Sequence, residues 1–247
     1  MFFSVLVGFV LGAFLPAMSS RFGKFMPADP GTALAGLFHR PRFPKGSASH
    51  CEKLKKLWIK FFKVSCLFGV LTALIYAGLV KCYPMPHRLW IEAMVFLILL
   101  LAMVDYKIML LPDILTIPLL LLGISYSVCM SADAYFARET LSPADSLLGA
   151  WFGYLLPTCI IFIMYPLMKG GFGGGDIKML MALGAWFGFV GLNLALMLSC
   201  FIFLIMTLLR GERSGPYGPS LAVAALFVVF LFSPMGKEFF PVLSFFG

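Results

Sequence analysis

A series of long apolar runs constrains the fold more than any other feature of this sequence. A helix needs ~20 residues to cross the core of a bilayer, and most of these runs approach or reach that length. Over the whole chain 61% of the 247 residues are hydrophobic and 12% are charged, whereas soluble domains average about half apolar and a quarter charged. The sequence therefore predicts an all-α integral membrane protein. We expect about eight transmembrane helices, at residues 2–18, 64–82, 89–106, 114–131, 147–168, 177–190, 192–209 and 219–234.

Two of these runs need separate comment. Residues 177–209 are too long for one span and barely long enough for two, and Gly188, Gly191 and Asn193 mark the expected turn between them. The first run has no basic residue ahead of it, and basic residues follow it. This order is not that of a cleavable signal peptide and indicates a retained span with its N-terminus outside the cytoplasm.

Lys and Arg residues predict the orientation, because cytoplasmic loops carry an excess of them. Segment 19–63 is the most basic part of the chain, and with eight spans it lies in the cytoplasm. Fifteen of the 19 basic residues then lie on that side, including Lys107, Lys169, Lys178, Arg210 and Arg213. The net charge of +8 is explained by topology and by attraction to anionic lipid headgroups. We expect the lipid bilayer as a partner and no nucleic acid.

The cysteines do not predict a metal site. The six of them are scattered, with no CxxC pair, and most lie inside apolar runs, where a free cysteine behaves as a small hydrophobic residue. The sequence shows neither a disulfide framework nor a zinc motif. We therefore expect no metal.

Three aspartates lie at the ends of the predicted spans. Asp105 closes the third span, Asp113 precedes the fourth, and Asp176 opens the sixth. Ionisable groups at membrane depth are costly and often mark functional sites. A structural alternative remains for Asp113 and Asp176, since an acid at a helix N-terminus caps the helix and interacts favourably with its dipole. Glu92, near the outer end of the third span, is better explained as a charge at headgroup level.

The stretch "GGFGGGDIKML" (170–180) places five glycines and an acid ahead of an apolar helix. Two phosphate-binding patterns are excluded. GxxxxGK[ST] is absent, and GxGxxG fails because Asp176 occupies the third glycine position. What remains is a GxGD pattern formed by Gly173, Gly174, Gly175 and Asp176. Glycines allow a substrate backbone to approach closely.

A second acid beside Asp176 would complete a pair of carboxyl groups able to catalyse hydrolysis. Two carboxyl groups held close together share one proton, so that one acts as a base toward water and the other as an acid toward a carbonyl oxygen. This is aspartic peptide hydrolysis, which needs neither a metal nor a cysteine.

Three ordered blocks are similar to the type IV prepilin peptidase family of GxGD membrane aspartic proteases. "VDYKIMLLPDILTIPLLLLG" (104–123) resembles the family's Asp, Leu-Pro-Asp, Leu-Thr and Pro-Leu-Leu block. "GGFGGGDIKMLMALGAWFG" (170–188) resembles its GxGD block, and "GPYGPSLAVAAL" (215–226) resembles its Pro-Phe-Gly-Pro block. Residues 7–27 resemble its N-terminal block less closely, with Ala13 for Ser and Pro16 for Asn.

The resemblance implies roles for individual residues. Asp105 and Asp176 match the two catalytic positions, whereas Asp113 matches an Asp outside that pair. The residues expected to bind substrate or shape the site are Gly173, Gly174, Gly175, Lys178, Pro112 and Asp113. Such enzymes cut the basic leader from type IV prepilins or pseudopilins, after Gly and before a hydrophobic residue. They act at the cytoplasmic face of the bacterial inner membrane.

Many members of the family also methylate the new N-terminus with S-adenosylmethionine. Fuller members carry four cysteines in the first cytoplasmic loop, where this chain has Cys51 alone. We accordingly expect two regions, residues 1–63 as the first span with a basic loop that is a possible methyltransferase region, and residues 64–247 as the peptidase domain. Two other classes remain open: a proton-coupled transporter, which predicts acids spread over the membrane depth, and a non-catalytic subunit of a secretion machine.

Overall fold

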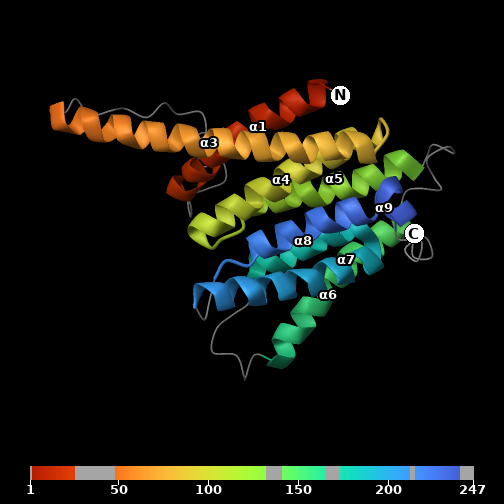
Figure 1. Cartoon of the computed structure of the whole chain (residues 1–247). Coiled ribbons are helices and arrows are strands. Elements are labelled where there is room, and N and C mark those ends of the chain that lie inside the picture. The colour runs from red at the N-terminus through yellow and green to blue at the C-terminus, as the bar shows by residue number, and fades with distance from the viewer. Residues whose placement is uncertain (1, 26–47, 132–140, 165–172, 212–214, 240–247) are drawn as a thin grey trace. The chain divides into compact units, whose positions relative to one another are not determined.

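The structure is a computed structural model of the chain, and it describes residues 2–25, 48–131, 141–164, 173–211 and 215–239. Within these ranges every regular element is a helix (Figure 1). The prediction of an all-α membrane protein with several spans is confirmed. The helices are α1 (Phe2–Phe25), α3 (Ala48–Cys82), α4 (His87–Ile108), α5 (Asp113–Ser131), α6 (Pro143–Met164), α7 (Gly174–Arg210), α8 (Gly218–Leu231) and α9 (Pro234–Phe239).

The chain divides into two compact units, Met1–Lys81 and Cys82–Gly247. In the first unit, α1 packs closely on α3 through small residues. The Thr72 hydroxyl of α3 donates a hydrogen bond of 2.7 Å to the carbonyl oxygen of Gly8, and a Cβ atom on Gly12 would lie 1.7 Å from the same hydroxyl oxygen. Helix α3 is longer than the predicted span 64–82, because it continues without a break through the basic residues that precede residue 64.

Six helices of the described ranges are long and apolar enough to cross a membrane: Phe2–Phe22, Ile59–Cys82, His87–Ile108, Asp113–Ser131, Pro143–Ile163 and Gly174–Arg210. Helix α8 is a shorter apolar helix of 14 residues. The sequence predicts about eight spans, and the difference lies in α7 and α8. Helix α8 falls short of the ~20 residues that a full crossing requires, and α7 includes two of the predicted spans.

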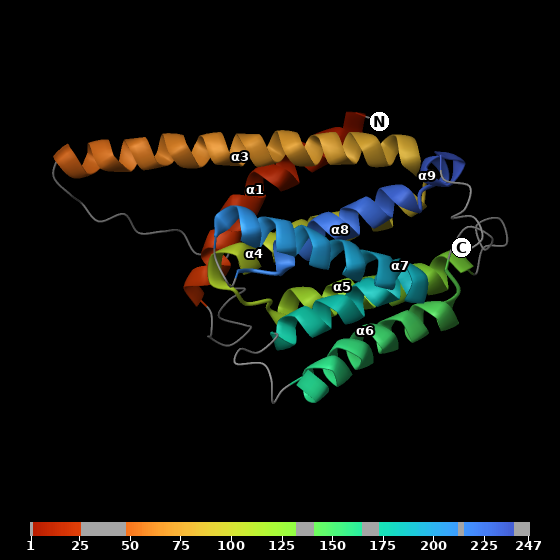
Figure 2. The same cartoon turned by 60° about the horizontal axis from the view of Figure 1, so that its bottom comes forward.

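Helix α7 folds back on itself at Gly188. A straight helix of its 37 residues would be about 55 Å long. Yet Arg210 at its end lies 5.4 Å from the ring of Tyr106, while Asp176 at its start interacts electrostatically with Asp105. Both ends of α7 are therefore near the same end of α4, and Figure 2 shows the two parts meeting at a bend.

The bend requires glycine. Gly188 has φ 64° and ψ −170°, a conformation that residues with a Cβ atom essentially never adopt. It is one of the three residues that mark the expected turn. We call residues 174–187 the first limb of α7 and residues 189–210 its second limb.

Helix α6 packs on the first limb of α7 with almost no space between the backbones. A Cβ atom on Gly184 would lie 2.1 Å from the carbonyl oxygen of Gly149, and one on Gly153 would lie 2.5 Å from that of Leu180. Ser146 donates a hydrogen bond of 2.7 Å to the carbonyl oxygen of Ala185. Small residues allow this close approach in membranes, where helices associate by packing rather than by exclusion of water.

The other contacts of the second unit bring four helix ends together. Helix α4 contacts α5 and α8, and α7 contacts α5 and α8. Large side chains of these helices are fully buried in the core, among them Met94, Ile98, Leu101, Leu119, Met179, Leu183 and Leu221. Polar contacts then join the C-terminal end of α4 to the start of α8, and the start of α5 to the start of α7. The predicted site residues lie at these ends.

Candidate active site

Asp105 is buried in the last turn of α4, with 5% of its surface exposed. Its Oδ2 atom accepts a hydrogen bond of 2.8 Å from the backbone N–H of Gly218, the first residue of α8. The N-terminus of a helix carries unpaired N–H groups and a partial positive charge, so it stabilises an anion. The start of α8 thus holds the carboxyl group of Asp105 in place.

Gly218 makes this contact possible by its lack of a side chain. A Cβ atom at this position would lie 2.8 Å from Asp105 Oδ2 and 2.9 Å from Asp105 Cβ. Gly218 is not among the site residues predicted from the sequence, although it lies in the block "GPYGPS" that carries the resemblance. A signal was present, because a glycine followed by a proline at the start of an apolar helix marks a helix N-terminus.

Asp176 is the third residue of α7 and is partly buried. Its carboxyl group accepts a hydrogen bond from the backbone N–H of Gly173, the N-cap residue of the helix. This is the acidic half of a capping box, in which a side chain at the third helical position satisfies the N-cap N–H. The capping role considered from the sequence is therefore present, and it fixes the orientation of the carboxyl group.

The fold brings Asp105 and Asp176 together from two helix ends. The two carboxyl groups are close enough to interact electrostatically. Among the described residues neither carboxyl group forms an ion pair. Within the described ranges the site therefore contains two acids without a direct counter-charge on either. Such a pair can hold one proton between its members, because ionising both would place like charges side by side.

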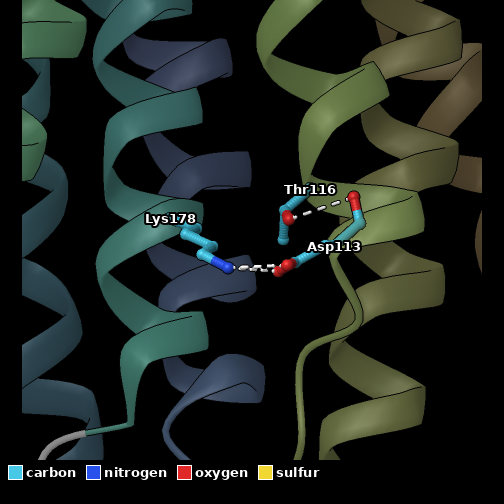
Figure 3. A network of polar contacts seen from close by, with 3 residues as sticks. All are labelled: Asp113, Thr116 and Lys178. Carbon is cyan, nitrogen blue, oxygen red and sulfur yellow. Dashed lines mark hydrogen bonds and ion pairs between the residues drawn. The ribbon is translucent and has the colours of Figure 1, made fainter.

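Asp113 has a different environment. It is the first residue of α5, and both of its carboxylate oxygens accept hydrogen bonds from Lys178 Nζ, at 2.7 and 2.6 Å (Figure 3). The ion pair is about half exposed, at 42% for the Lys178 side chain and 54% for that of Asp113. Because Lys178 follows Asp176 by two residues, this ion pair links the start of α5 to the helix turn that carries Asp176.

Pro112 and the glycines shape the backbone around the acids. The Pro112 carbonyl oxygen accepts hydrogen bonds from the N–H groups of Leu115 and Thr116, which begins α5. A Cβ atom on Gly175 would lie 2.7 Å from Leu111 Cβ, whereas one on Gly174 would have no neighbour within 4 Å. Gly175 therefore allows α7 to pack against the segment before α5, and the backbone at Gly174 lies beside open space.

Two further contacts at this end of the unit were not predicted from the sequence. Arg210, at the end of α7, lies over the ring of Tyr106, and the hydroxyl of Tyr217 hydrogen-bonds with that of Ser199. Both contacts join residues distant in the sequence, so no local pattern indicates them. They place the second limb of α7 beside the C-terminal end of α4 and the N-terminal end of α8.

The described residues include no group of three or more His, Cys, Asp or Glu side chains able to hold a metal ion. The side chain of Cys51 and most of the basic segment 19–63 lie outside the described residues. The same segment is the expected methyltransferase region, so the described residues assign no site to S-adenosylmethionine.

Comparison with known proteins gives the class. The model of the type IV leader peptidase family matches residues 91–208, a range that contains Asp105, Asp113 and Asp176. A prepilin leader peptidase/N-methyltransferase of Pseudomonas aeruginosa is 31% identical over 261 residues, covering 90% of this chain and 87% of the relative. One of Pectobacterium carotovorum is 28% identical, covering 90% of this chain and 89% of the relative. No solved structure matches the chain.

The chain belongs to the type IV leader peptidase family. The resemblance inferred from the three sequence blocks is confirmed, and so is the prediction of an enzyme of the prepilin peptidase class. Both relatives are named for an N-methyltransferase activity as well as for the peptidase.

Proposed function

We propose that this protein removes the leader peptide of type IV prepilins or pseudopilins, and that Asp105 and Asp176 are its catalytic residues. The observation that carries the proposal is the pair of carboxyl groups brought together at the ends of α4 and α7 without an ion-pair partner among the described residues. Both acids lie at one end of the unit, whereas a proton-coupled transporter is expected to distribute acids over the membrane depth.

The reaction uses one ionised and one protonated carboxyl group. The ionised group removes a proton from a water molecule as the water oxygen attacks the scissile carbonyl carbon. The protonated group gives its proton to the carbonyl oxygen, which forms a neutral gem-diol. When the gem-diol collapses, one of its hydroxyl groups gives its proton to the ionised carboxylate, the C–N bond breaks, and the leaving nitrogen takes up the proton of the other carboxyl group. The products are a carboxylic acid and an amine, and the pair again holds one proton.

Three groups keep this pair in position. The N–H of Gly218 holds Asp105 and the N–H of Gly173 holds Asp176, so each carboxyl group has one oriented oxygen. The Asp113–Lys178 ion pair fixes the first turn of α7 relative to α5. Preorganised groups of this kind require little reorganisation during the reaction, which is a large part of enzymatic rate enhancement. We therefore assign Pro112, Asp113, Lys178 and the three glycines to shaping the site.

Among the described residues, nothing lies within 4 Å of where a Cβ atom on Gly174 would stand, and this space supports the approach of a substrate backbone to Asp176. We propose cleavage after Gly and before a hydrophobic residue, as the family resemblance implies. Small residues on one side of the scissile bond let the chain reach a pair that lies partly below the surface.

The basic residues of the chain support a location of the pair at the cytoplasmic face of the bacterial inner membrane. Lys107 and Lys178 are on the two helix ends that carry the pair, and Arg210 lies beside Tyr106 at the end of α4. Cytoplasmic helix ends are rich in such residues. A basic leader would meet anionic headgroups at this face.

The names of the relatives support a second reaction, methylation of the new N-terminal amine. S-adenosylmethionine supplies the methyl group for such a reaction when it is bound. We place this activity with the basic segment 19–63, which separates it from the aspartate pair in the sequence.

The proposed function is tested with the purified full chain in detergent or lipid and a prepilin-like substrate with a Gly-Phe junction. The expected product is shorter by the leader, as measured by intact mass, and appears with the wild type but not with Asp105→Asn. Addition of S-adenosylmethionine should add the mass of one methyl group to the product. An unchanged substrate mass with correctly inserted wild-type protein would contradict the proposed peptidase activity.

A further inference from the structure

Tyr217 is the residue immediately before α8, and its side chain lies against the second limb of α7. Its hydroxyl hydrogen-bonds with the Ser199 hydroxyl and lies 3.7 Å from the Cys200 sulfur atom. Its ring meets that of Phe203 edge to face, with 5.5 Å between the centroids. Three positions on one stretch of the second limb thus hold this side chain.

The direction of the hydrogen bond follows from its neighbours. Ser199 Oγ lies 2.8 Å from the carbonyl oxygen of Leu196, which can only accept a hydrogen bond. The Ser199 hydroxyl therefore donates to Leu196 and accepts from Tyr217. Because Ser199 is fully buried, no water competes for this bond.

Tyr217 remains able to donate over the pH range in which the enzyme works. Burial raises the pKa of its hydroxyl, and the nearby charge of Asp176 adds to the rise. The phenol is therefore neutral and keeps its proton at all pH values at which carboxyl groups titrate. The interaction with Asp176 also shows that the Tyr217 side chain lies near the second acid of the pair.

The contacts of Tyr217 and Gly218 form a direct link. The side chain of Tyr217 is anchored to the second limb of α7, and the next N–H group along the backbone holds Asp105 Oδ2 at 2.8 Å. Adjacent residues cannot move independently, so a shift of Tyr217 moves the Gly218 N–H. No other described residue donates to the Asp105 carboxyl group.

We propose that Tyr217 is a positioning residue of the peptidase, whose anchorage on Ser199 holds the start of α8 so that Gly218 keeps Asp105 oriented toward Asp176. This inference rests on the proposed function, because it takes Asp105 and Asp176 as the catalytic pair. Tyr217 does not exchange a proton with the substrate. Its effect passes through the backbone to Asp105.

The test is a set of steady-state measurements on full-length variants with the prepilin-like substrate. Tyr217→Phe removes the hydroxyl and keeps the ring, and Ser199→Ala removes its acceptor. A buried hydrogen bond between membrane helices contributes modestly to stability, so we expect kcat to fall about 3- to 10-fold in each variant. KM should stay within about 2-fold, because the bond orients the reacting groups and does not bind substrate. The double variant should be no slower than the slower single variant, because both changes break the same bond.

Two controls separate positioning from a general loss of stability. Ser146→Ala removes another buried serine hydrogen bond, to Ala185 on the first limb of α7, away from the pair. It should lower the melting temperature by as much as Ser199→Ala does and leave kcat unchanged. Tyr154→Phe makes the same substitution at an exposed tyrosine of α6 and should change neither quantity.

The outcomes distinguish this inference from the proposed function. If the wild type cleaves and Asp105→Asn does not, while Tyr217→Phe and Ser199→Ala keep wild-type kcat, the positioning role is wrong and the peptidase assignment stands. A rise in KM at constant kcat would overturn it as well, since Tyr217 would then bind substrate. Independent, multiplying losses in the double variant would show that the two hydroxyls do not act through one bond. If the wild type itself does not cleave, the proposed function fails first.

Discussion

Each end of α4 carries an acid, and the charged neighbours of these two acids have opposite signs. Near its N-terminal end, Glu92 faces Arg88 on the same helix, with Oε1 3.5 Å from the Arg88 Nε atom. Near its C-terminal end, Asp105 accepts an N–H from Gly218 and has a second acid, Asp176, as its charged neighbour. An acid that serves the structure of a membrane protein is neutralised by a cation, because an unpaired charge is costly there. Asp105 has no such cation in the part of the chain that the structure describes, and this is the feature that indicates chemistry.

The same contrast repeats over two residues of α7. Lys178 forms its ion pair with Asp113 on another helix, and Asp176, two positions earlier, does not share it. A cation is thus present at the site but is directed to the acid outside the pair. All three aspartates lie at helix ends, so their place along a helix does not distinguish them, whereas their partners do.

The largest effect expected is from removing either member of the pair. Asp105→Asn and Asp176→Asn each keep the shape of the side chain and remove the ionisable group. We expect cleavage of the prepilin-like substrate to fall by at least about 10³-fold in each, in the range lost with a general acid or base. Product mass over time measures this. Protease protection of the membrane-inserted variants must match that of the wild type, and substantial activity in either variant would break the contrast between the acids.

A glycine substitution can displace the carboxyl group of Asp105 without changing its chemistry. Gly218→Ala would bring a methyl group 2.8 Å from Asp105 Oδ2. A shift of about 1 Å in a catalytic group costs on the order of 10²-fold in rate, and we expect a loss of that size in kcat. Gly215→Ala is the control, because a Cβ atom at this position, three residues before Gly218, would meet nothing within 4 Å. Equal activity in both variants would mean that the Gly218 contact does not orient Asp105.

A smaller effect is expected when the Asp113–Lys178 ion pair is broken. Half-exposed ion pairs contribute about 0–1 kcal/mol, so Asp113→Asn and Lys178→Met should each lower kcat about 2- to 5-fold. The double variant should resemble the single ones, because both remove one interaction. Initial rates at saturating substrate measure all three. If Asp113→Asn is as inactive as Asp176→Asn, the pair has been assigned to the wrong aspartates.

The smallest effect is expected from metal removal. Two carboxyl groups and water suffice for the proposed hydrolysis, so EDTA or 1,10-phenanthroline should leave the rate of cleavage within about 2-fold. Methylation should be equally insensitive, since the sequence lacks the cysteine set of the fuller family members. Cleavage that stops with chelator and returns with added zinc would contradict a purely aspartic mechanism.

Sequence patterns predict the elements of this fold well, because membrane spans are determined by local composition. The long apolar runs correspond to helices, and the turn expected among Gly188, Gly191 and Asn193 occurs at Gly188, whose φ is 64°. Helices α5 and α7 start at Asp113 and Gly174, one and three residues before the predicted starts at 114 and 177. The lengths are less well predicted, since α3 extends through charged residues that carry no apolar signal.

Contacts between distant residues are not contained in such patterns. The sequence identifies Asp105, Asp113 and Asp176 as candidates, but the partner of each depends on how four helix ends meet. Neither the hydrogen bond from the Gly218 N–H to Asp105 nor the one from the Tyr217 hydroxyl to Ser199 follows from sequence spacing, because helix packing in three dimensions determines both. The family resemblance implies that Asp105 and Asp176 form a pair, but it does not say which helix contacts bring them together.

The dependence of kcat/KM on pH reports directly whether Asp105 and Asp176 share one proton. If Asp105 and Asp176 share one proton, only the singly protonated pair is active, and the profile must be bell-shaped with two ionisations that belong to the pair. The pH profile of the Asp113→Asn variant should keep both ionisations, because Asp113 is paired with Lys178 and takes no part in the proton transfers. We predict this result for the purified enzyme with a substrate that lacks ionisable groups near the scissile bond. A profile with a single ionisation, in a protein that cleaves the substrate, would contradict the aspartate pair.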